Sequence, residues 1–351
     1  MPRRRRILVT GVARWWGGRL VQRLSEQPDV AEVIGIDTQE PSYDFGRGEF
    51  VRLDIRHSLI GKLVRAVGID TVVHTATTVD SFDPDPRAAH ETNVIGTMNL
   101  LAGCTGAGSP VRRFVLKSSA HVYGAGRDLP VPVREDRRLA PDSAPSFVQD
   151  MIEVEQQAQD FALRTGKLQV LILRFVNSLN AEEPQPLARY LNLALVPTVL
   201  RCDPSLQLIH HADCTVALAR AAMTGPAGAY NIAAPTAVPL SELLEGAGKL
   251  HAPLLPPLAT GLTAMVLRLA GITLSDQLLS LLRHGRVLST SRATLVLKFR
   301  PELDTQSAYL EFLEHARVLS YLPDRQHHQF EQELEEFIRS RAPSRRRAPR
   351  G

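Results

Sequence analysis

The stretch "RILVTGVARWWGGRL" (residues 6–20) places a short apolar run directly before a glycine-bearing turn and a segment of helical periodicity. The run 7–9 is typical of a parallel strand covered on both faces. Free backbone N–H groups and the dipole of the following helix make such a turn an anion site, usually for a nucleotide diphosphate. A dinucleotide fingerprint requires glycine at position 14, but Arg14 stands between Gly11 and Gly17. The stretch alone therefore leaves two readings open, cofactor binding and a turn whose glycines serve packing.

The net charge of +4 conceals an acidic body. Ten of the 41 basic residues are arginines in the terminal runs 3–6 and 339–350, which leaves 31 basic against 37 acidic residues and a charge of −6 elsewhere. This balance argues against a nucleic-acid groove on the folded body. We expect both arginine-rich ends to be solvated and disordered.

Three cysteines without metal-type spacing favour a reducing compartment, and we expect a cytoplasmic protein. The first apolar run is too short for a signal peptide. The most apolar segment, residues 254–274, is interrupted by two prolines and Arg268. It therefore predicts one or two buried helices rather than a membrane span.

Strands alternate with helices through the first half of the chain, which predicts βαβ units in a doubly wound, Rossmann-type parallel sheet with a smaller C-terminal substrate lobe. The expected strands are 7–10, 31–37, 49–55, 70–76, 112–120 and 168–175, and the later helices are 60–67, 88–104 and 146–164. The expected division is a disordered N-terminus (1–6), a cofactor domain (7–177), a mainly substrate-binding lobe with segments returning to the first domain (178–338), and a disordered tail (339–351).

The second expected strand ends at Asp37, 20 residues after Gly17. An acidic residue at this spacing hydrogen-bonds the adenosine ribose, and it would repel a 2′-phosphate. Residues 38–40 supply no cation. Asp37 therefore favours NAD over NADP, and the alternative is a strand-terminal aspartate that only caps a turn.

Nine motifs in order resemble the extended short-chain dehydrogenase/reductase family, of the NAD-dependent nucleotide-sugar epimerase/dehydratase type. They are "VTGVARWWGG" (9–18), "LDIR" (53–56), "VVHTAT" (72–77), "ETNVIGTMNLL" (91–101), "VLKSSAHVYG" (115–124), "ILRFVN" (172–177), "LQLIHHADCTVALARA" (206–221), "AYNIA" (229–233) and "STSRA" (289–293). The resemblance implies a cofactor site made by Gly11, Arg14, Gly17, Asp37, Asp54, Ile55, Thr75, Ala76 and Asn93. It also implies that Ser119 is the active-site serine.

The resemblance breaks at the family's Tyr-x-x-x-Lys pair, in which the tyrosine is the acid/base and the lysine lowers its pKa. Alignment on Glu155 puts Phe147 and Met151 at these positions, and residues 141–159 contain neither tyrosine nor lysine. Neither replacement can transfer a proton. Nearby candidates for a substitute acid/base are His121, Tyr123 and Asp150.

Several functions stay open on this basis. The chain is expected to bind NAD and to act on a nucleotide-linked sugar or similar small molecule with an atypical active site. Alternatives are an inactive NAD-binding regulatory or scaffolding protein, an enzyme that performs a non-redox reaction on a nucleotide-linked substrate, and a hydroxysteroid-dehydrogenase-like oxidoreductase. No metal is expected, because His210, His211 and Asp213 lack a further ligand at suitable spacing. The expected partner is the small-molecule substrate, with a homodimer as a candidate assembly.

Overall fold

The computed structural model describes residues 4–42, 44–77, 86–137, 139–140, 146–254 and 276–321. Its centre is a seven-stranded sheet in the order β11-β6-β5-β4-β1-β2-β3, in which all neighbouring strands are parallel. The strands are β1 (Arg5–Thr10), β2 (Val30–Asp37), β3 (Glu49–Arg52), β4 (Thr71–His74), β5 (Arg113–Ser119), β6 (Gln169–Phe175) and β11 (Gly228–Ile232). The prediction of a doubly wound Rossmann-type sheet is confirmed.

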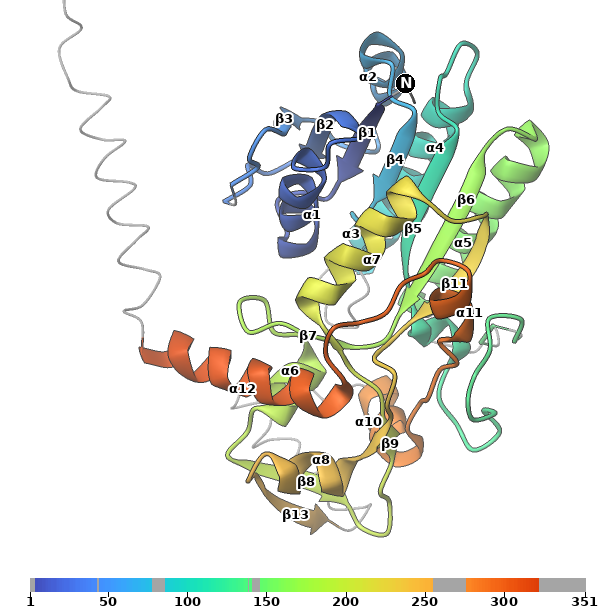
Figure 1. Cartoon of the computed structure of the whole chain (residues 1–351). Helices are drawn as coiled ribbons and strands as arrows, with labels where there is room; N and C mark the ends of the chain where they lie inside the picture. Colours follow the sequence, from blue (N-terminus) through green and yellow to red (C-terminus); the bar gives the residue numbers. More distant parts are fainter. Residues whose placement is uncertain are drawn as a thin grey trace, which may run out of the picture.

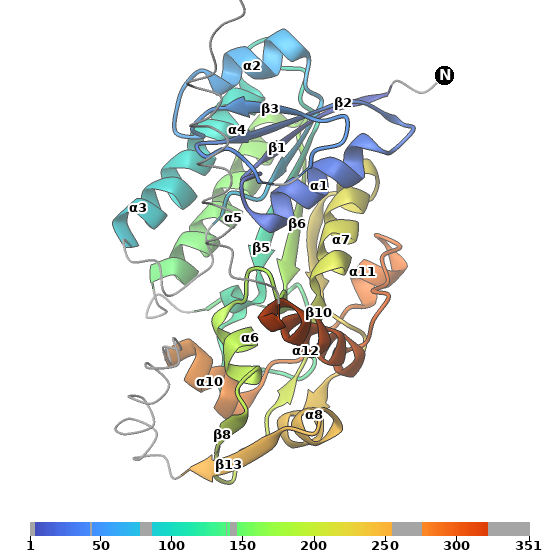
Figure 2. The same cartoon turned by 90° about the vertical axis from the view of Figure 1, so that its left-hand side faces the viewer.

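Helices cover both faces of the sheet (Figures 1 and 2). One face packs against α1 (Trp15–Ser25) and α7 (His211–Met223), in a core that contains Ile7 and Val9 of β1. The opposite face packs against α2 (Ile60–Val67), α4 (Thr97–Thr105) and α5 (Ser146–Thr165), where Leu8 is buried. A buried strand between two helical layers must be apolar on both sides, which explains the uninterrupted run at 7–9.

Two predicted boundaries need correction. Arg5 and Arg6 are part of β1 rather than of a disordered end: Arg5 donates hydrogen bonds to Thr71 Oγ1 and the Met223 carbonyl, and the Arg6 side chain donates to the Val67 carbonyl. The single helix predicted over 88–104 is three segments, α3 (Pro86–His90), the π-helix η1 (Glu91–Gly96) and α4. The segment 254–274, apart from Leu254, and the tail 339–351 lie outside the described residues.

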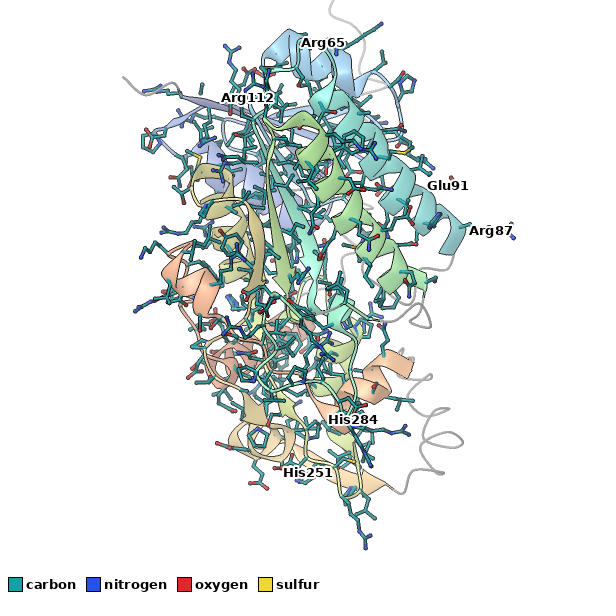
Figure 3. The ribbon with its side chains drawn as sticks, turned by 90° about the vertical axis from the view of Figure 1, so that its right-hand side faces the viewer. Arg65, Arg87, Glu91, Arg112, His251 and His284 are labelled. Atoms are coloured by element: carbon teal, nitrogen blue, oxygen red, sulfur yellow. The ribbon has the colours of Figure 1, made fainter. Side chains whose placement is uncertain are left out.

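The second lobe lies beyond the carboxyl ends of the strands. Figure 3 shows Arg65 and Arg112 at the far end of the sheet domain, while His251 and His284 lie in the lobe. Its elements are β7 (Ser178–Leu179), α6 (Pro186–Leu191), β8 (Leu195–Val199), β9 (Ser205–Leu206), β10 (Ile209–His210), β12 (Val238–Pro239), α8 (Leu240–Gly246), β13 (Leu250–Leu254), α10 (Asp276–His284) and α12 (Thr305–Tyr321). The short 3-10 helix η2 (Ala120–Tyr123) follows β5, and α11 (Ser291–Leu295) packs on β11. In open parallel sheets, ligands bind outside the carboxyl ends of the strands, where the strand order reverses, here between β1 and β4.

Candidate active site

Two cavities meet at the turn that follows β1, and Gly11 and Arg14 line both of them. The first is lined by Gly11, Arg14, Trp16, Thr75, Lys117, Ser118, Ser119, His121, Phe175, Val176, Asn177, Ser178, Glu183 and Gln185. The second is lined by Gly11, Ala13, Arg14, Ile36, Asp37, Thr38, Gln39, Leu53, Asp54, Ile55, Arg56, Ala76, Ala88, Ala89 and Thr92. We call the first the β5 cavity and the second the β2 cavity.

The two glycines of the turn allow backbone segments to approach closely. Gly11 has φ of +76°, and a Cβ at this residue would lie 2.7 Å from the backbone nitrogen and Cα of Ala76. A Cβ on Gly17 would lie 2.2 Å from the carbonyl oxygen of Gly11. Any side chain at either position would collide with backbone atoms. Packing therefore accounts for both glycines, and Gly11 also borders both cavities.

In the β2 cavity, Asp37 connects the glycine turn to its own loop. Its Oδ2 accepts a hydrogen bond from the Ala13 N–H at 3.0 Å, and its Oδ1 accepts from the N–H groups of Thr38 and Gln39 at 2.7 and 3.2 Å. Asp37 thus caps its own turn and also lines the β2 cavity. Asp54 is paired with Arg56 at 2.7 Å, and this hydrogen bond is the main reason that the pKa of Asp54 is lowered.

In the β5 cavity, Ser119 and His121 form a hydrogen-bonded pair. Ser119 Oγ lies 2.7 Å from His121 Nδ1, and it also accepts the His121 backbone N–H at 3.3 Å as the cap of η2. Burial, with a smaller effect of Arg286, holds the pKa of His121 well below its usual value, so the imidazole is neutral at pH 7. A neutral imidazole beside a hydroxyl can pass a proton between the two groups.

The other proposed acid/base residues point elsewhere. The Tyr123 hydroxyl donates to Asn231 Oδ1 and accepts from Arg174, both at 2.7 Å. Asp150 is buried and lies 2.7 Å from His90 Nδ1. Neither Tyr123 nor Asp150 lines either cavity. Of the three substitutes that the sequence suggested, the structure brings His121 to Ser119.

Phe147 and Met151 are buried in the first two turns of α5, where the core cluster also contains Val122 and Tyr123 of η2. The Phe147 ring contacts the His121 ring edge-on. Glu155, on which the alignment with the family rests, is fixed by Ser118 Oγ at 2.5 Å and by Arg174. No tyrosine or lysine occurs in α5.

Most of the predicted cofactor residues lie at the cavities. Asp37, Asp54, Ile55 and Ala76 line the β2 cavity, and Thr75 lines the β5 cavity. Asn93 does not line either cavity; it is fully buried on η1, where its carbonyl accepts a hydrogen bond from Thr97.

Two charged residues of the β5 cavity, Lys117 and Glu183, were not predicted from the sequence. Lys117 lies on a central strand; burial, followed by the charge of Arg14, lowers its pKa to about 8. Its signal in the sequence is a single charge between the apolar run 114–116 and the two serines that end β5. Its ammonium donates to the Thr77 carbonyl at 3.3 Å and lies 5.1 Å from the centre of the Trp16 ring.

The histidines at 210 and 211 pack in the interior. His211 contacts Trp15 edge-on at 4.4 Å, and Asp213 accepts the Glu302 N–H at 3.0 Å. Neither histidine lines either cavity. Within the described ranges, no group of three or more His, Cys, Asp or Glu side chains is arranged to hold a metal ion.

A family model described as "NAD dependent epimerase/dehydratase family" matches residues 7–233. The chain belongs to this family. The family resemblance inferred from the motifs is thereby confirmed, and NAD is the family's cofactor, as predicted. An uncharacterised protein of Mycobacterium tuberculosis is 37% identical over 314 residues, which cover 87% of this chain and 82% of that protein.

Solved structures share the fold of this family member. The UDP-glucose 4-epimerase of Thermotoga maritima, solved with UDP-glucose, has a TM-score of 0.69 at 18% identity and covers 90% of this chain and 99% of its own. The UDP-glucuronic acid 4-epimerase of Bacillus cereus, solved with NAD, has a TM-score of 0.68 at 18% identity with the same coverage. Among the described helices, none is long and apolar enough to cross a membrane.

Proposed function

We propose that the protein binds NAD across the two cavities and catalyses hydride-based chemistry on a nucleotide-linked sugar or similar small molecule, with Ser119 and His121 handling the proton. The observation that carries this proposal is the junction of the two cavities at Gly11 and Arg14. Asp37 lines one cavity, and the Ser119–His121 pair lines the other. A dinucleotide would place its adenosine in the β2 cavity, its diphosphate at the junction and its reactive ring in the β5 cavity.

The residues present fit the adenosine half of NAD. Asp37, at the carboxyl end of β2, would accept hydrogen bonds from the ribose hydroxyls, and Ile55 and Leu53 would contact the adenine. Arg56 also lines this cavity, but Asp54 and Glu91 hold its guanidinium at 2.7 and 3.2 Å. A 2′-phosphate would face the carboxylate of Asp37, so we propose a preference for NAD over NADP.

The diphosphate would lie at the N-terminus of α1. Arg14 is the N-cap residue of this helix, and its exposed side chain borders both cavities. Where the family fingerprint has glycine, a guanidinium can still pair with phosphate oxygens. In this proposal, the Arg14 guanidinium binds the diphosphate by charge, in place of the close contact between backbone and phosphate that a glycine would allow.

At the other end, NAD when bound would accept a hydride from a hydroxyl-bearing carbon and return it. Ser119 Oγ would hydrogen-bond that hydroxyl, and His121 would take the proton through Ser119. Burial keeps the pKa of His121 low, so its imidazole is in the neutral form that can accept a proton. Phe147 and Met151 stand, in this proposal, at the positions of the family's tyrosine and lysine.

The substrate would enter from the lobe side. Residues 175–178, where the chain passes from β6 into the lobe, line the β5 cavity beside Ser119. A nucleotide sugar is the proposed substrate class because the UDP-sugar epimerases named above have the same fold. The lobe, which in this proposal begins after residue 177, would select among sugars.

A second candidate is a regulatory protein that binds NAD without turnover. The observation in its favour is the apolar pair on α5: Phe147 and Met151 are buried and offer no proton donor. The binding half of the site is the same in both candidates. They differ only in what happens at Ser119 and His121.

Mass spectrometry of the purified protein and a UDP-sugar assay test the proposal. We expect NAD(H) to co-purify, and UDP-glucose, UDP-galactose or UDP-glucuronic acid to be converted in the presence of NAD. Ser119→Ala and His121→Gln should each lower turnover by about 10²-fold or more while NADH affinity stays unchanged. NADH binding without conversion of any sugar would favour the regulatory candidate, and absence of NADH binding would refute both.

A further inference from the structure

The N-terminus of α1, where the diphosphate would bind, already holds a carboxylate from a distant part of the chain. The backbone N–H of Trp15 donates to Glu183 Oε1 at 3.0 Å, and the indole Nε1–H of the same residue donates to Glu182 Oε1 at 3.2 Å. Both glutamates lie in the segment between β7 and α6. Asn180 Oδ1 accepts the Glu182 N–H at 3.0 Å and so shapes this segment.

Helix α1 otherwise lacks an anionic cap. It spans 11 residues, its N-cap Arg14 makes no side-chain capping bond, and its first turn contains no acidic residue. Unpaired N–H groups and the helix dipole favour a negative charge at this point. Glu183 therefore supplies from the lobe the anion that the helix lacks.

Glu183 shares the β5 cavity with two cations, Arg14 and Lys117. The charges act on one another: Arg14 lowers the pKa of Lys117, whereas Glu183 raises it. A helix N–H that binds this carboxylate, in a cavity also lined by two side-chain cations, makes an anion site of the type that phosphates use.

We propose that Glu183 occupies the place of the cofactor's diphosphate and is displaced from Trp15 when NAD binds. This inference rests on the proposed NAD site. Two anions cannot share the same N–H donors, and a carboxylate left beside a diphosphate would repel it. Cofactor binding thus releases the segment around Glu183, which continues through Gln185, the N-cap of α6, into the core of the lobe. Loading of the cofactor is coupled to the lobe through this contact.

Glu183→Gln tests the proposal because it removes the charge and keeps an oxygen that can accept the Trp15 N–H. Glu182→Gln is the matched control, since it neutralises the neighbouring carboxylate, which accepts the indole N–H of Trp15 rather than its backbone N–H. NADH binding can be followed by quenching of the two tryptophans of the chain, Trp15 and Trp16, both at the site. We expect Glu183→Gln to bind NADH about three- to tenfold more tightly than the native protein, and Glu182→Gln to change affinity by less than about twofold.

The outcomes separate this inference from the function on which it rests. If the native protein binds NADH and Glu183→Gln binds it equally or more weakly, the displacement is wrong and the NAD site stands. If neither protein binds NADH, the proposed function fails and the inference falls with it. Binding by Glu183→Gln alone would support both.

Hydrogen exchange of the native protein gives a second measurement that does not depend on the variant folding. NADH should protect residues 11–18 and at the same time increase exchange in residues 181–186. Protection of both segments would show that Glu183 stays in place, and it would overturn the proposal.

Discussion

The ring of Phe147 lies edge-on to the imidazole of His121, with 5.9 Å between the ring centroids. His121 in turn is hydrogen-bonded to Ser119. An apolar ring thus packs against the pair to which we assign proton transfer. The distance places position 147 close enough for a hydroxyl on that ring to alter the chemistry of the site.

We expect Phe147→Tyr to raise turnover of UDP-sugars by up to about 10²-fold, because a phenol at this position restores a proton donor. Adding Met151→Lys should raise turnover further but lower stability, since Met151 is fully buried and a lysine there buries a charge. Sugar conversion, NADH affinity and Tm should be measured together, with Phe147→Leu as the control. Unchanged turnover in Phe147→Tyr, or native turnover near the enzyme median of about 10 s⁻¹, would contradict the assigned role of position 147.

Asp37→Ala should weaken NADH binding by about 1.5–3 kcal/mol, the contribution of a hydrogen bond to a charged group. Asp37→Asn, which retains only one of the two acceptor oxygens that bind the Ala13 and Thr38 N–H groups, should lose less. Calorimetric titration with NADH and NADPH checks both affinity and preference. Tighter binding of NADPH than of NADH by the native protein would show that the assignment of Asp37 is wrong.

Glu155→Gln should destabilise the fold by about 3–5 kcal/mol, because it leaves a buried guanidinium without its counter-charge. Arg174 is 4% exposed and Glu155 1% exposed, and their closest contact is 2.6 Å. Urea unfolding at neutral pH measures the loss. Glu153→Gln, at an exposed position of the same helix, is the matched control and should have little effect.

Acid should destabilise the protein through His74. Its ring nitrogens lie 2.7 Å from Thr10 Oγ1 and 2.9 Å from Thr97 Oγ1, and burial lowers its pKa from 6.5 to about 3. Between these two values the unfolded chain binds a proton that the native state does not. The free energy of unfolding therefore falls as the pH decreases through this window, by up to about 1.4 kcal/mol per pH unit from this group.

His74→Gln keeps hydrogen-bonding capacity but cannot titrate, so its unfolding free energy should depend less steeply on pH by about one proton. Unfolding should be compared between pH 7.5 and 5. His57→Gln changes an exposed histidine and serves as the control. An equal slope in the native protein and His74→Gln would contradict the assignment.

The sheet was predictable because its signals are local. Apolar runs, turn glycines and helix periods occur within ten or so residues of one another, and the helix 60–67 agrees with its predicted bounds. The start of β1 was not predictable, because two arginines are usually surface residues. Arg5 and Arg6 are held by hydrogen bonds to residues more than 60 positions away.

The candidate site was predictable only in part, because some of its contacts join residues that are far apart in the sequence. Ser119 and Asp37 are the last residues of β5 and β2, and strand ends are where sequence alone predicts ligands. Glu183, in contrast, meets Trp15 across 168 positions. Tyr123 is four residues from Ser119, and Asp150 lies on α5, the helix that carries Phe147 and Met151. The side chains of Tyr123 and Asp150 are directed to Asn231 and His90 by contacts that no local pattern encodes.

The return of the chain to the sheet limits how this protein could be re-engineered. After β6 the chain enters the lobe, and it comes back to add α7 and β11 before leaving again. The Arg113 guanidinium on β5 binds the carbonyls of Ala221, Thr224 and Gly225 at the end of α7. A lobe taken from a relative would therefore have to be introduced as two separate segments, one before α7 and one after β11, with α7 and β11 left unchanged. Replacement of one continuous stretch would also replace β11 and so remove an edge strand of the sheet.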